Sequence, residues 1–286
     1  MSGFNTITDL HDLQFFSNLT SIISKTIYCF KSEQSMNHFK KHKGKDIIKS
    51  PDGLFDGLPL FSCELKRDGS YLLSSDSTNY TIYKYVIIPS DSKHPDKKLL
   101  EEKYLHNSKK YKLIDVNAQY NVSIYKYVYC EVINKLAYLS LTKKRRSLLK
   151  FEDDSLTMVF HTYHDYITIT DNDMFEGNQW IFRENEGNVF VDDLYINDRY
   201  KLVNKDGHVA AAYDNSNRSN KWFPTTIREK LCDLKFPVMN NPPQYSTNPK
   251  IENYKNDYLS KFHENIVCMV FVLANYIRAL EREKSN

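Results

Sequence analysis

The chain has 286 residues, of which 41% are hydrophobic and 26% are charged, so it can bury a sizeable core and is too apolar to be disordered. Its formal net charge of +3 selects no strongly acidic or basic partner. Tyrosine and phenylalanine number 21 and 16, against only 8 glycines, a bias typical of half-buried strands.

The cysteines are odd in number and widely scattered, which fits neither a disulfide framework nor a zinc site. We expect reduced and mostly buried thiols at Cys29, Cys63, Cys130, Cys232 and Cys268. The first twelve residues lack the basic start and apolar run of a secretory signal. The most apolar stretch, Ile266–Ala274, is half the length needed to cross a bilayer. The sequence therefore predicts a cytoplasmic protein with no membrane partner.

Residues 1–36 predict a long amphipathic helix. Thr6 and Asp9 have the spacing of a capping box, and apolar residues then recur every three or four positions. The stripe consists of Leu10, Leu13, Phe16, Leu19, Ile23, Ile27 and Phe30. Such a stripe packs either on the protein's own domain or on another subunit. On the second alternative, the helix is an assembly arm that joins subunits.

From residue 60 to about 214 the apolar period changes to two, and Gly/Asn/Asp turn signals separate the runs. The expected strands are Phe61–Leu65, Tyr71–Ser75, Tyr80–Ile88, Tyr111–Val116, Val122–Val132, Ala137–Leu141, Leu156–Tyr163, Tyr166–Thr170, Trp180–Arg183, Val189–Ile196 and His208–Tyr213. Short strands at this density indicate an antiparallel sandwich or barrel. We predict an α+β fold, with an antiparallel β-sandwich core over 37–224 and a helical insertion near 96–106.

Residues 225–286 predict C-terminal helices joined by a Pro/Asn-rich loop and packed on the core, as part of a single domain. Thr225–Leu234 is expected to be a short helix, and Pro237–Pro249 is irregular because it holds four prolines. Apolar residues spaced three or four apart between Tyr258 and Leu280 then predict a closing helix. This helix is apolar nearly all round in its middle, which predicts burial on more than one side.

The pentapeptide IYKYV occurs twice, within Thr81–Ile88 and within Ser123–Cys130. Strand alternation places Tyr125, Tyr127 and Tyr129 of the second copy on one face and its aliphatic residues on the other. Two copies are too few for a repeat architecture. A shared solution for a half-buried strand and a chance resemblance both remain open.

Motifs of the common enzyme classes are absent: there is no GxxxxGK, GxGxxG, HExxH or GxSxG, so we name no catalytic residue. His161 and His164, beside Asp165, point to opposite faces of a strand and predict no metal site. The loop that starts at Asp171 has Phe182 where a calcium loop needs its twelfth-position acid, which indicates a solvated turn. A metal-free hydrolase stays open, but no triad identifies it.

The densest basic cluster is Lys143, Lys144, Arg145 and Arg146, which could contact phosphates. Together with an aromatic sheet it supports an alternative function, a soluble viral or host-interaction protein that binds nucleic acid or a nucleotide. The low net charge argues against nucleic acid as a partner.

The stretch RDGSYLLSSDSTNY at Arg67–Tyr80 contains an Asp-Gly-Ser turn, an aliphatic strand, a polar turn and a tyrosine that opens the next strand. It is similar to the early hairpin of the cypovirus polyhedrins, which crystallise around virus particles inside infected insect cells. The expected order of elements and the richness in tyrosine also resemble that family. The resemblance implies homotrimers in a crystalline lattice that encloses virions, in the cytoplasm of the infected host cell and later in occlusion bodies. It also implies nucleotides bound at lattice contacts, for which no motif is found.

On this interpretation the chain is a structural protein that self-assembles into viral occlusion bodies and dissolves at alkaline pH. Ionisation of all tyrosines near their reference pKa of ~10 would take the charge from +3 to about −18, so that packed subunits repel one another. The first candidates for this alkaline trigger are Tyr83, Tyr85, Tyr125, Tyr127 and Tyr129.

Overall fold

The computed structural model describes residues 10–19, 25–51, 54–65, 78–89, 108–111, 120, 122–136, 145–161, 166–182, 200–214, 228–237 and 259–285. Strands dominate these ranges, and their pairings are all antiparallel. Within them, two α-helices occur, α1 (Glu33–His42) and α4 (Lys261–Ser285).

Twelve strands form a closed up-and-down barrel rather than the predicted sandwich. They are β1 (Leu10–Leu19), β2 (Lys25–Phe30), β5 (Phe61–Leu65), β6 (Thr78–Pro89), β8 (Val122–Leu136), β9 (Arg145–Lys150), β10 (Ser155–Phe160), β11 (Tyr166–Thr170), β12 (Gln179–Phe182), β13 (Tyr200–Val203), β14 (Val209–Asp214) and β15 (Arg228–Pro237). Each pairs with the next of these along the chain, and β1 pairs with β15 to complete the ring. The sandwich prediction was wrong because closure, which leaves no sheet edge, depends on long-range pairing that local periodicity does not encode.

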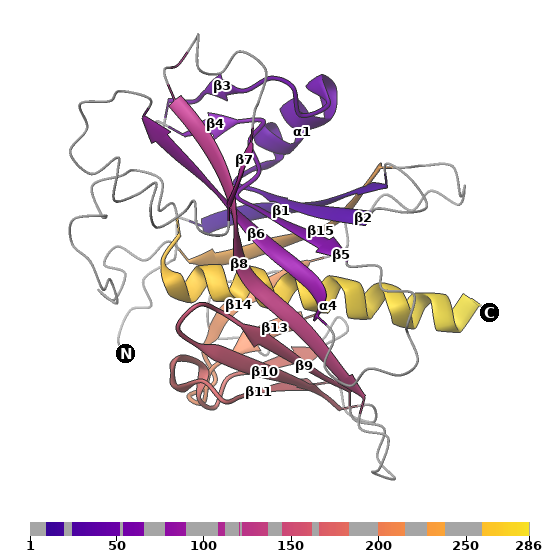
Figure 1. The fold of residues 1–286 in the computed structure, drawn as a ribbon. Coiled ribbons are helices and arrows are strands. Elements are labelled where there is room, and N and C mark those ends of the chain that lie inside the picture. The colour runs from indigo at the N-terminus through magenta and orange to yellow at the C-terminus, as the bar shows by residue number, and fades with distance from the viewer. Residues whose placement is uncertain are drawn as a thin grey trace, which may run out of the picture.

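Three short strands lie outside the ring. β7 (Ser108–Tyr111) pairs with the first half of β8, whose second half pairs with β9. β3 (Ile48–Lys49) and β4 (Phe55–Asp56) form a separate hairpin beside α1 (Figure 1).

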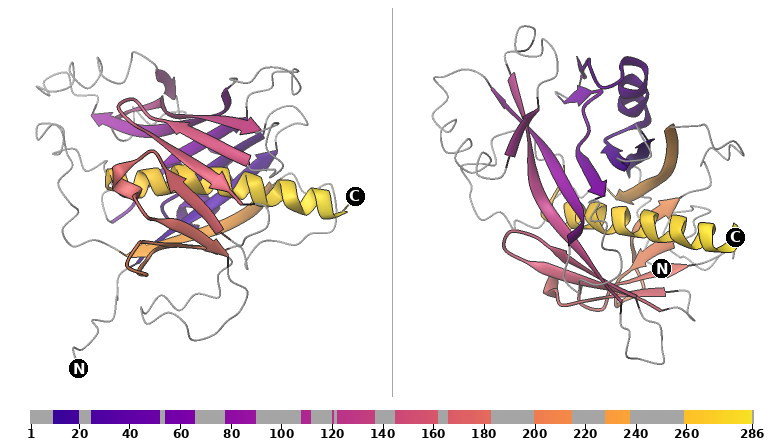
Figure 2. Two further views of the ribbon diagram at one scale, coloured as in Figure 1. Left: turned by 90° about the horizontal axis from the view of Figure 1, so that it is seen from below. Right: turned by 45° about the vertical axis from the view of Figure 1, so that its right-hand side comes forward.

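Helix α4 runs through the barrel. Figure 1 shows it in yellow, with β1, β2, β5 and β15 on one side and β9, β10, β11, β13 and β14 on the other, and Figure 2 shows the same enclosure from two further directions. The residues from Ile266 to Leu273 are almost completely buried. The ring of Phe271 meets that of Phe15 edge to face, with centroids 5.1 Å apart. The predicted closing helix is therefore confirmed, and the barrel wall is what buries it on all sides.

The predicted N-terminal helix is wrong, because residues 10–19 and 25–30 are strands. Leu13 and Ile27 belong to the main core around α4, whereas Phe16 packs with Phe30 and Met36 beneath α1 on the outer face. Both faces of the wall are covered here, so apolar residues no longer alternate with polar ones and their spacing imitates a helix. Leu10 and Leu19 lie in β1, and Ile23 lies outside the described residues.

A second predicted helix, at 225–234, is also wrong, because its described residues, 228–234, lie in the strand β15. In β15 the register shifts opposite Phe15 and Phe16 of β1, so Leu231 is an extra residue in the ladder. Leu231, Cys232 and Leu234 all join the main core, and the bulge produces an apolar spacing that resembles a helical one.

Several strand predictions are confirmed. Phe61–Leu65 and Tyr166–Thr170 have the predicted bounds, and β6, β8, β10, β12 and β14 differ from their predictions by a few residues. β9 and β13 were not predicted. The predicted elements at 71–75, 96–106, 137–141 and 189–196 lie outside the described residues.

The five cysteines are free and buried, as predicted. Cys29 and Cys232 flank Phe15 across three adjacent strands, and all five thiols belong to the core around α4. Burial raises the pKa values of Cys29, Cys232 and Cys268 well above the ordinary value for a thiol. These cysteines therefore act as small apolar side chains.

The two IYKYV copies pair with each other. In the antiparallel β6–β8 ladder, Lys84 of the first copy lies opposite Tyr127 of the second, and Tyr85 lies opposite Lys126. Lys84 faces inward, where it forms an ion pair with Glu264 of α4, whereas Lys126 lies beside Tyr83 and Glu64. The copies thus present equivalent residues to opposite faces of the wall.

Candidate functional site

A small layer, which we call the cap, covers part of the outer wall of the barrel. It comprises residues 31–51 and 54–58 and contains α1, β3 and β4 (Figure 1). Two apolar clusters attach it: Met36 and Phe39 of α1 pack on the outer face of β1 and β2, and a second cluster covers the outer face of β6 and β8. The second cluster contains Ile47, Phe55, Leu58, Tyr85 and Ile124.

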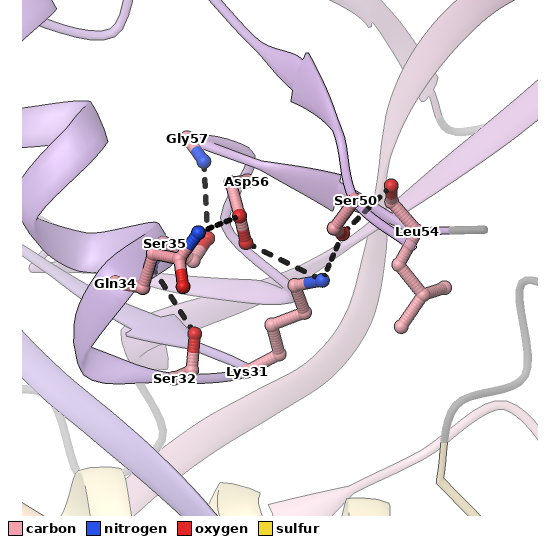
Figure 3. Close-up of polar contacts among 8 residues, drawn as sticks. All are labelled: Lys31, Ser32, Gln34, Ser35, Ser50, Leu54, Asp56 and Gly57. Atoms are coloured by element: carbon pink, nitrogen blue, oxygen red, sulfur yellow. Dashed lines mark hydrogen bonds and ion pairs between the residues drawn. The ribbon is translucent and has the colours of Figure 1, made fainter. Parts of the chain in front are cut away.

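A buried cation organises the polar contacts beneath the cap (Figure 3). Lys31, directly after β2, lies with its Nζ 3.3 Å from Asp56 Oδ1 and donates a hydrogen bond to Ser50 Oγ. Gln34 Nε2 donates to the other Asp56 oxygen at 2.9 Å, and Ser50 Oγ donates to the Leu54 carbonyl at 3.0 Å. These bonds join the start of α1 to both strands of the β3–β4 hairpin.

The start of α1 is set by Ser32, whose Oγ accepts the backbone N–H of Ser35. Its end is a tight reversal in which Lys43 and Gly44 both have positive φ. The N–H of Gly44 bonds to the Phe39 carbonyl, a left-handed helix cap. The reversal returns the chain along the helix and places Asp46 beside the last two turns.

Two histidines and one aspartate meet at this reversal. His38 and His42 lie one turn apart on α1, and their Nε2 and Nδ1 atoms are 3.1 Å and 3.5 Å from the same oxygen, Asp46 Oδ2. The two imidazole rings stack with centroids 4.3 Å apart. The exposed side-chain fractions are 13%, 34% and 44% for His38, His42 and Asp46, so the cluster is supported from below and open to solvent above.

Gly57 allows a close approach behind this cluster. Its φ is +85°, and a Cβ atom there would lie 2.6 Å from His38 Cδ2 and 2.7 Å from the Asp46 carbonyl oxygen. The Gly57 N–H donates to Ser35 Oγ at 3.0 Å. The end of β4 therefore fixes the relative position of α1 and the segment that carries Asp46.

The cap also concentrates positive charge. Residues 40–49 contain five lysines and one aspartate, a net of +4, whereas the whole chain carries +3, so all other residues together are close to neutral. Lys41, Lys43, Lys45 and Lys49 are exposed, and we call these four the basic face.

An exposed apolar residue lies in the same segment of the chain as the basic face. Ile48 is 50% exposed and is the only exposed large apolar side chain among the described residues. Its neighbour Lys49 and the nearby Lys45 are exposed as well. None of the helices in the described ranges combines the length and hydropathy required to span a bilayer.

The five tyrosines proposed as an alkaline trigger do not share one face. Tyr85 lies beneath the cap and donates a hydrogen bond to Ser62 Oγ at 3.2 Å. Tyr125 and Tyr127 lie opposite Val86 and the inward-facing Lys84. Tyr83 lies on the outer face, where its ring is 4.1 Å from the Lys126 ammonium.

Tyr129 is an extra residue in the β8 ladder, because Ile82 pairs with Cys130 and Tyr83 with Val128. Tyr129 faces inward together with Tyr127, as the predicted alternation has it, and its hydroxyl donates to Asn265 Oδ1 at 3.5 Å. The alternation fails at the next residue, because the bulge turns Cys130 into the same core instead of to the opposite face. Burial, and then the nearby Glu264, raise the pKa of Tyr129 well above its ordinary value. Burial, and then Glu64, also raise the pKa of Tyr83.

The other sequence candidates have local roles or lie outside the described residues. Arg145 lies 6.0 Å from the ring of Tyr276 of α4, Arg146 is exposed on β9, and Lys143 and Lys144 lie outside the described ranges. His161 Nε2 lies 3.1 Å from Thr168 Oγ1, and the neighbouring candidates His164 and Asp165 are not described. The loop after Asp171 forms a 3₁₀ turn, η1 (Asp173–Phe175), with exposed acids, as the solvated-turn prediction has it.

The sequence prediction missed the His38, His42 and Asp46 cluster. The available signal was the spacing of two histidines four residues apart, followed by an aspartate four residues later. That spacing has meaning only on a helix, and the prediction ended the N-terminal helix before His38.

The fold and the cap define a class of protein: an up-and-down β-barrel filled by its own C-terminal helix, with a basic cap on the outer wall. The family model DIA1 matches residues 19–286, and the chain therefore belongs to the DIA1 family. No curated protein and no solved structure matches the chain.

Two premises of the polyhedrin resemblance, the sandwich and the N-terminal helix, are wrong. Most of the stretch 67–80 that carried it lies outside the described residues. Self-assembly into occlusion bodies and nucleic-acid binding through residues 143–146 stay predictions.

Proposed function

We propose that this protein is a peripheral membrane-binding module whose cap docks on anionic lipid surfaces. The observation that carries the proposal is the place of Ile48, an exposed aliphatic side chain in the same nine-residue segment, 41–49, as four exposed lysines. Lysines attract the head groups of acidic lipids, and an aliphatic side chain among them can enter the boundary with the acyl chains. A nucleic acid backbone would engage the lysines but offer little to the isoleucine.

The binding energy suggests a weak and reversible attachment. Each lysine near an anionic membrane contributes ~1 kcal/mol, so the basic face contributes about 4 kcal/mol. Burial of the exposed half of Ile48 adds about 1 kcal/mol. A total of about 5 kcal/mol corresponds to dissociation constants between ~0.1 and 1 mM, and added salt weakens the larger part of it.

This proposal departs from the expectation that no membrane takes part. That expectation rested on the absence of a long apolar run, which concerns spanning and not surface attachment. The basic face also contains no arginine and no exposed aromatic residue, whereas stacking on single-stranded nucleic acid requires aromatic side chains.

The test is sedimentation of the full chain with vesicles of phosphatidylcholine alone or mixed with phosphatidylserine. We expect binding only to the acidic vesicles, about a hundredfold weaker when Lys41, Lys43 and Lys49 are replaced by Gln. Ile48→Ser should weaken it about fivefold. The matched control replaces three exposed lysines elsewhere, Lys150, Lys205 and Lys261, and should bind as the unmodified chain does.

Equal binding to neutral and acidic vesicles would overturn the proposal, as would equal losses in the two lysine variants. A different result would identify a nucleic acid as the partner instead. The chain would then bind a DNA or RNA duplex in a salt-sensitive way, Ile48→Ser would leave that binding unchanged, and acidic vesicles would not bind.

A further inference from the structure

We propose that His38, His42 and Asp46 bind a divalent transition metal ion, with zinc as the best match. The proposal is independent of membrane docking, because it rests on the geometry of these three side chains alone.

The donor atoms are already arranged for a tetrahedral ion. A tetrahedral zinc ion with bonds of ~2.0–2.1 Å holds its ligand atoms about 3.3–3.4 Å apart. The two measured edges, from Asp46 Oδ2 to His38 Nε2 and to His42 Nδ1, are 3.1 Å and 3.5 Å. All three donor atoms lie within 4.8 Å of one another. Small adjustments of the side chains are therefore enough to place an ion at equal distance from the three.

The donor set selects the class of metal. Two imidazole nitrogens and one carboxylate oxygen suit zinc and similar first-row ions, whereas calcium and magnesium take oxygen ligands. The same set, two histidines and one acid, leaves the fourth position of a tetrahedral zinc ion to water or to a ligand from a partner. The exposure of His42 and Asp46 gives solvent access to that position.

The surrounding fold holds the ligands without the metal. His38 and His42 are fixed one turn apart by α1, and Asp46 is returned to them by the reversal at Lys43 and Gly44. Gly57 leaves no room for a Cβ atom between itself, His38 and the Asp46 backbone, and its N–H is bonded to Ser35 of α1. A preformed site loses less freedom on binding, which raises its affinity.

The lysines of the basic face repel a bound cation, so they lower the affinity of the site for zinc. Lys41, Lys43 and Lys45 are exposed and point into solvent, where salt screens their repulsion of the ion. We therefore expect zinc to bind more tightly in 0.5 M sodium perchlorate than in 0.05 M. We also expect binding to weaken at acid pH, because the histidines must be neutral to act as ligands.

The test is calorimetric titration of the metal-free full chain with zinc. We expect one equivalent to bind, and a zinc-dependent rise of the melting temperature. His38→Gln, His42→Gln and Asp46→Asn should each lower the affinity at least about a hundredfold, since even changes outside the direct ligands cost ten- to hundredfold. The control is His208→Gln, at an exposed histidine in the turn before β14, which should bind zinc as the unmodified chain does.

A second measurement identifies the ligands. The cobalt-loaded chain should show the visible bands of a tetrahedral ion without the near-ultraviolet band of a cobalt–thiolate bond, and the triple variant should show neither. Zinc binding that persists when His38, His42 and Asp46 are all replaced would overturn the proposal. A cobalt–thiolate band, or failure of the unmodified chain to bind one equivalent of zinc, would also overturn it. The circular dichroism of each variant checks that the barrel is still folded.

Discussion

Lys84 of β6 and Glu264 of α4 form an ion pair inside the barrel, with Nζ and Oε1 2.5 Å apart and less than a tenth of either side chain exposed. The Lys84 ammonium also lies 5.9 Å from the ring of Tyr129. This pair and the Tyr129–Asn265 hydrogen bond link the wall to the start of the central helix, in a core that is otherwise largely apolar.

Breaking this pair should destabilise the fold strongly. Glu264→Gln leaves the Lys84 charge buried without a counter-charge, which costs about 3–5 kcal/mol of unfolding free energy. The double variant Lys84→Met with Glu264→Gln removes both charges and should recover much of that loss. Urea denaturation of the two single variants and the double variant measures the coupling, and a double variant as unstable as the two single losses combined would contradict it.

The second IYKYV copy supplies the matched control. Lys126 forms an ion pair with Glu64, whose side chain is 38% exposed. Pairs at the surface contribute about 0–1 kcal/mol, so Glu64→Gln should change the unfolding free energy by less than ~1 kcal/mol. If Glu64→Gln and Glu264→Gln lower the unfolding free energy by similar amounts, burial does not account for the difference expected between the two ion pairs.

Tyr129 should make the barrel sensitive to alkali. Because burial raises its pKa in the fold, the contribution of its neutral form to stability is present below the unfolded value and lost as pH rises. From about pH 10, where tyrosine in the unfolded chain ionises, the unfolding free energy should fall by ~1.4 kcal/mol per pH unit for this residue.

The variant Tyr129→Phe should therefore move the alkaline unfolding midpoint upward, measured by circular dichroism between pH 7 and pH 12. Its loss of the hydrogen bond to Asn265 should cost ~1 kcal/mol at neutral pH. Tyr83→Phe is the control, because the Tyr83 ring lies partly in solvent and its shift should be smaller. Identical midpoints for all three proteins would remove tyrosine ionisation as the cause of alkaline unfolding.

Asp12 should oppose folding at neutral pH. Burial, and then the nearby Asp233, raise the pKa of Asp12, so the fold favours the protonated carboxyl. The stability that this form contributes is present at low pH and is lost as pH rises above the unfolded value of ~3.9.

The variant Asp12→Asn should accordingly be more stable than the unmodified chain at pH 7, and the two should be equally stable below about pH 4. The gain should be only a few tenths of a kcal/mol, because Asp12 is partly in contact with solvent, which screens its charge. Melting temperatures at pH 3.5 and pH 7 measure it. Asp153→Asn, at an exposed position in the turn before β10, is the control, and a gain independent of pH would exclude ionisation of Asp12 as the cause.

Gly57→Ala should disturb the cap through contact as well as through backbone strain. The added Cβ meets His38 and the Asp46 carbonyl, and φ is +85°. Gly207 has nearly the same φ, +86°, but a Cβ added there would have nothing within 4 Å, so Gly207→Ala measures the backbone cost alone, ~1 kcal/mol. Gly57→Ala should lose more stability than Gly207→Ala and should weaken zinc binding, whereas Gly207→Ala should not. If the two variants lose equal amounts of unfolding free energy and bind zinc as the unmodified chain does, the close approach of Gly57 to His38 and Asp46 has no effect.

Local sequence determined the elements whose surroundings are simple. Phe61–Leu65 and Tyr166–Thr170 could be predicted because turn signals bound them and strand-forming residues fill them. The closing helix could be predicted because its middle is apolar nearly all round, which requires burial on more than one side, and residues 263–274 of α4 are buried.

Only the tertiary structure decided the rest. At Phe15 and Phe16 both faces of β1 are buried, one by α4 and one by α1, so the period of two disappears from the sequence. Bulges at Leu231 and Tyr129 shift the alternation by one residue, and local propensity does not specify them. Three further features depend on contacts between distant or reversed segments. They are the pairing of β1 with β15, the placement of Lys84 and Lys126 on opposite faces, and the approach of Asp46 to the two histidines. The sequence therefore determined seven strands of the barrel and the buried helix, whereas closure of the barrel and assembly of the site were decided by packing.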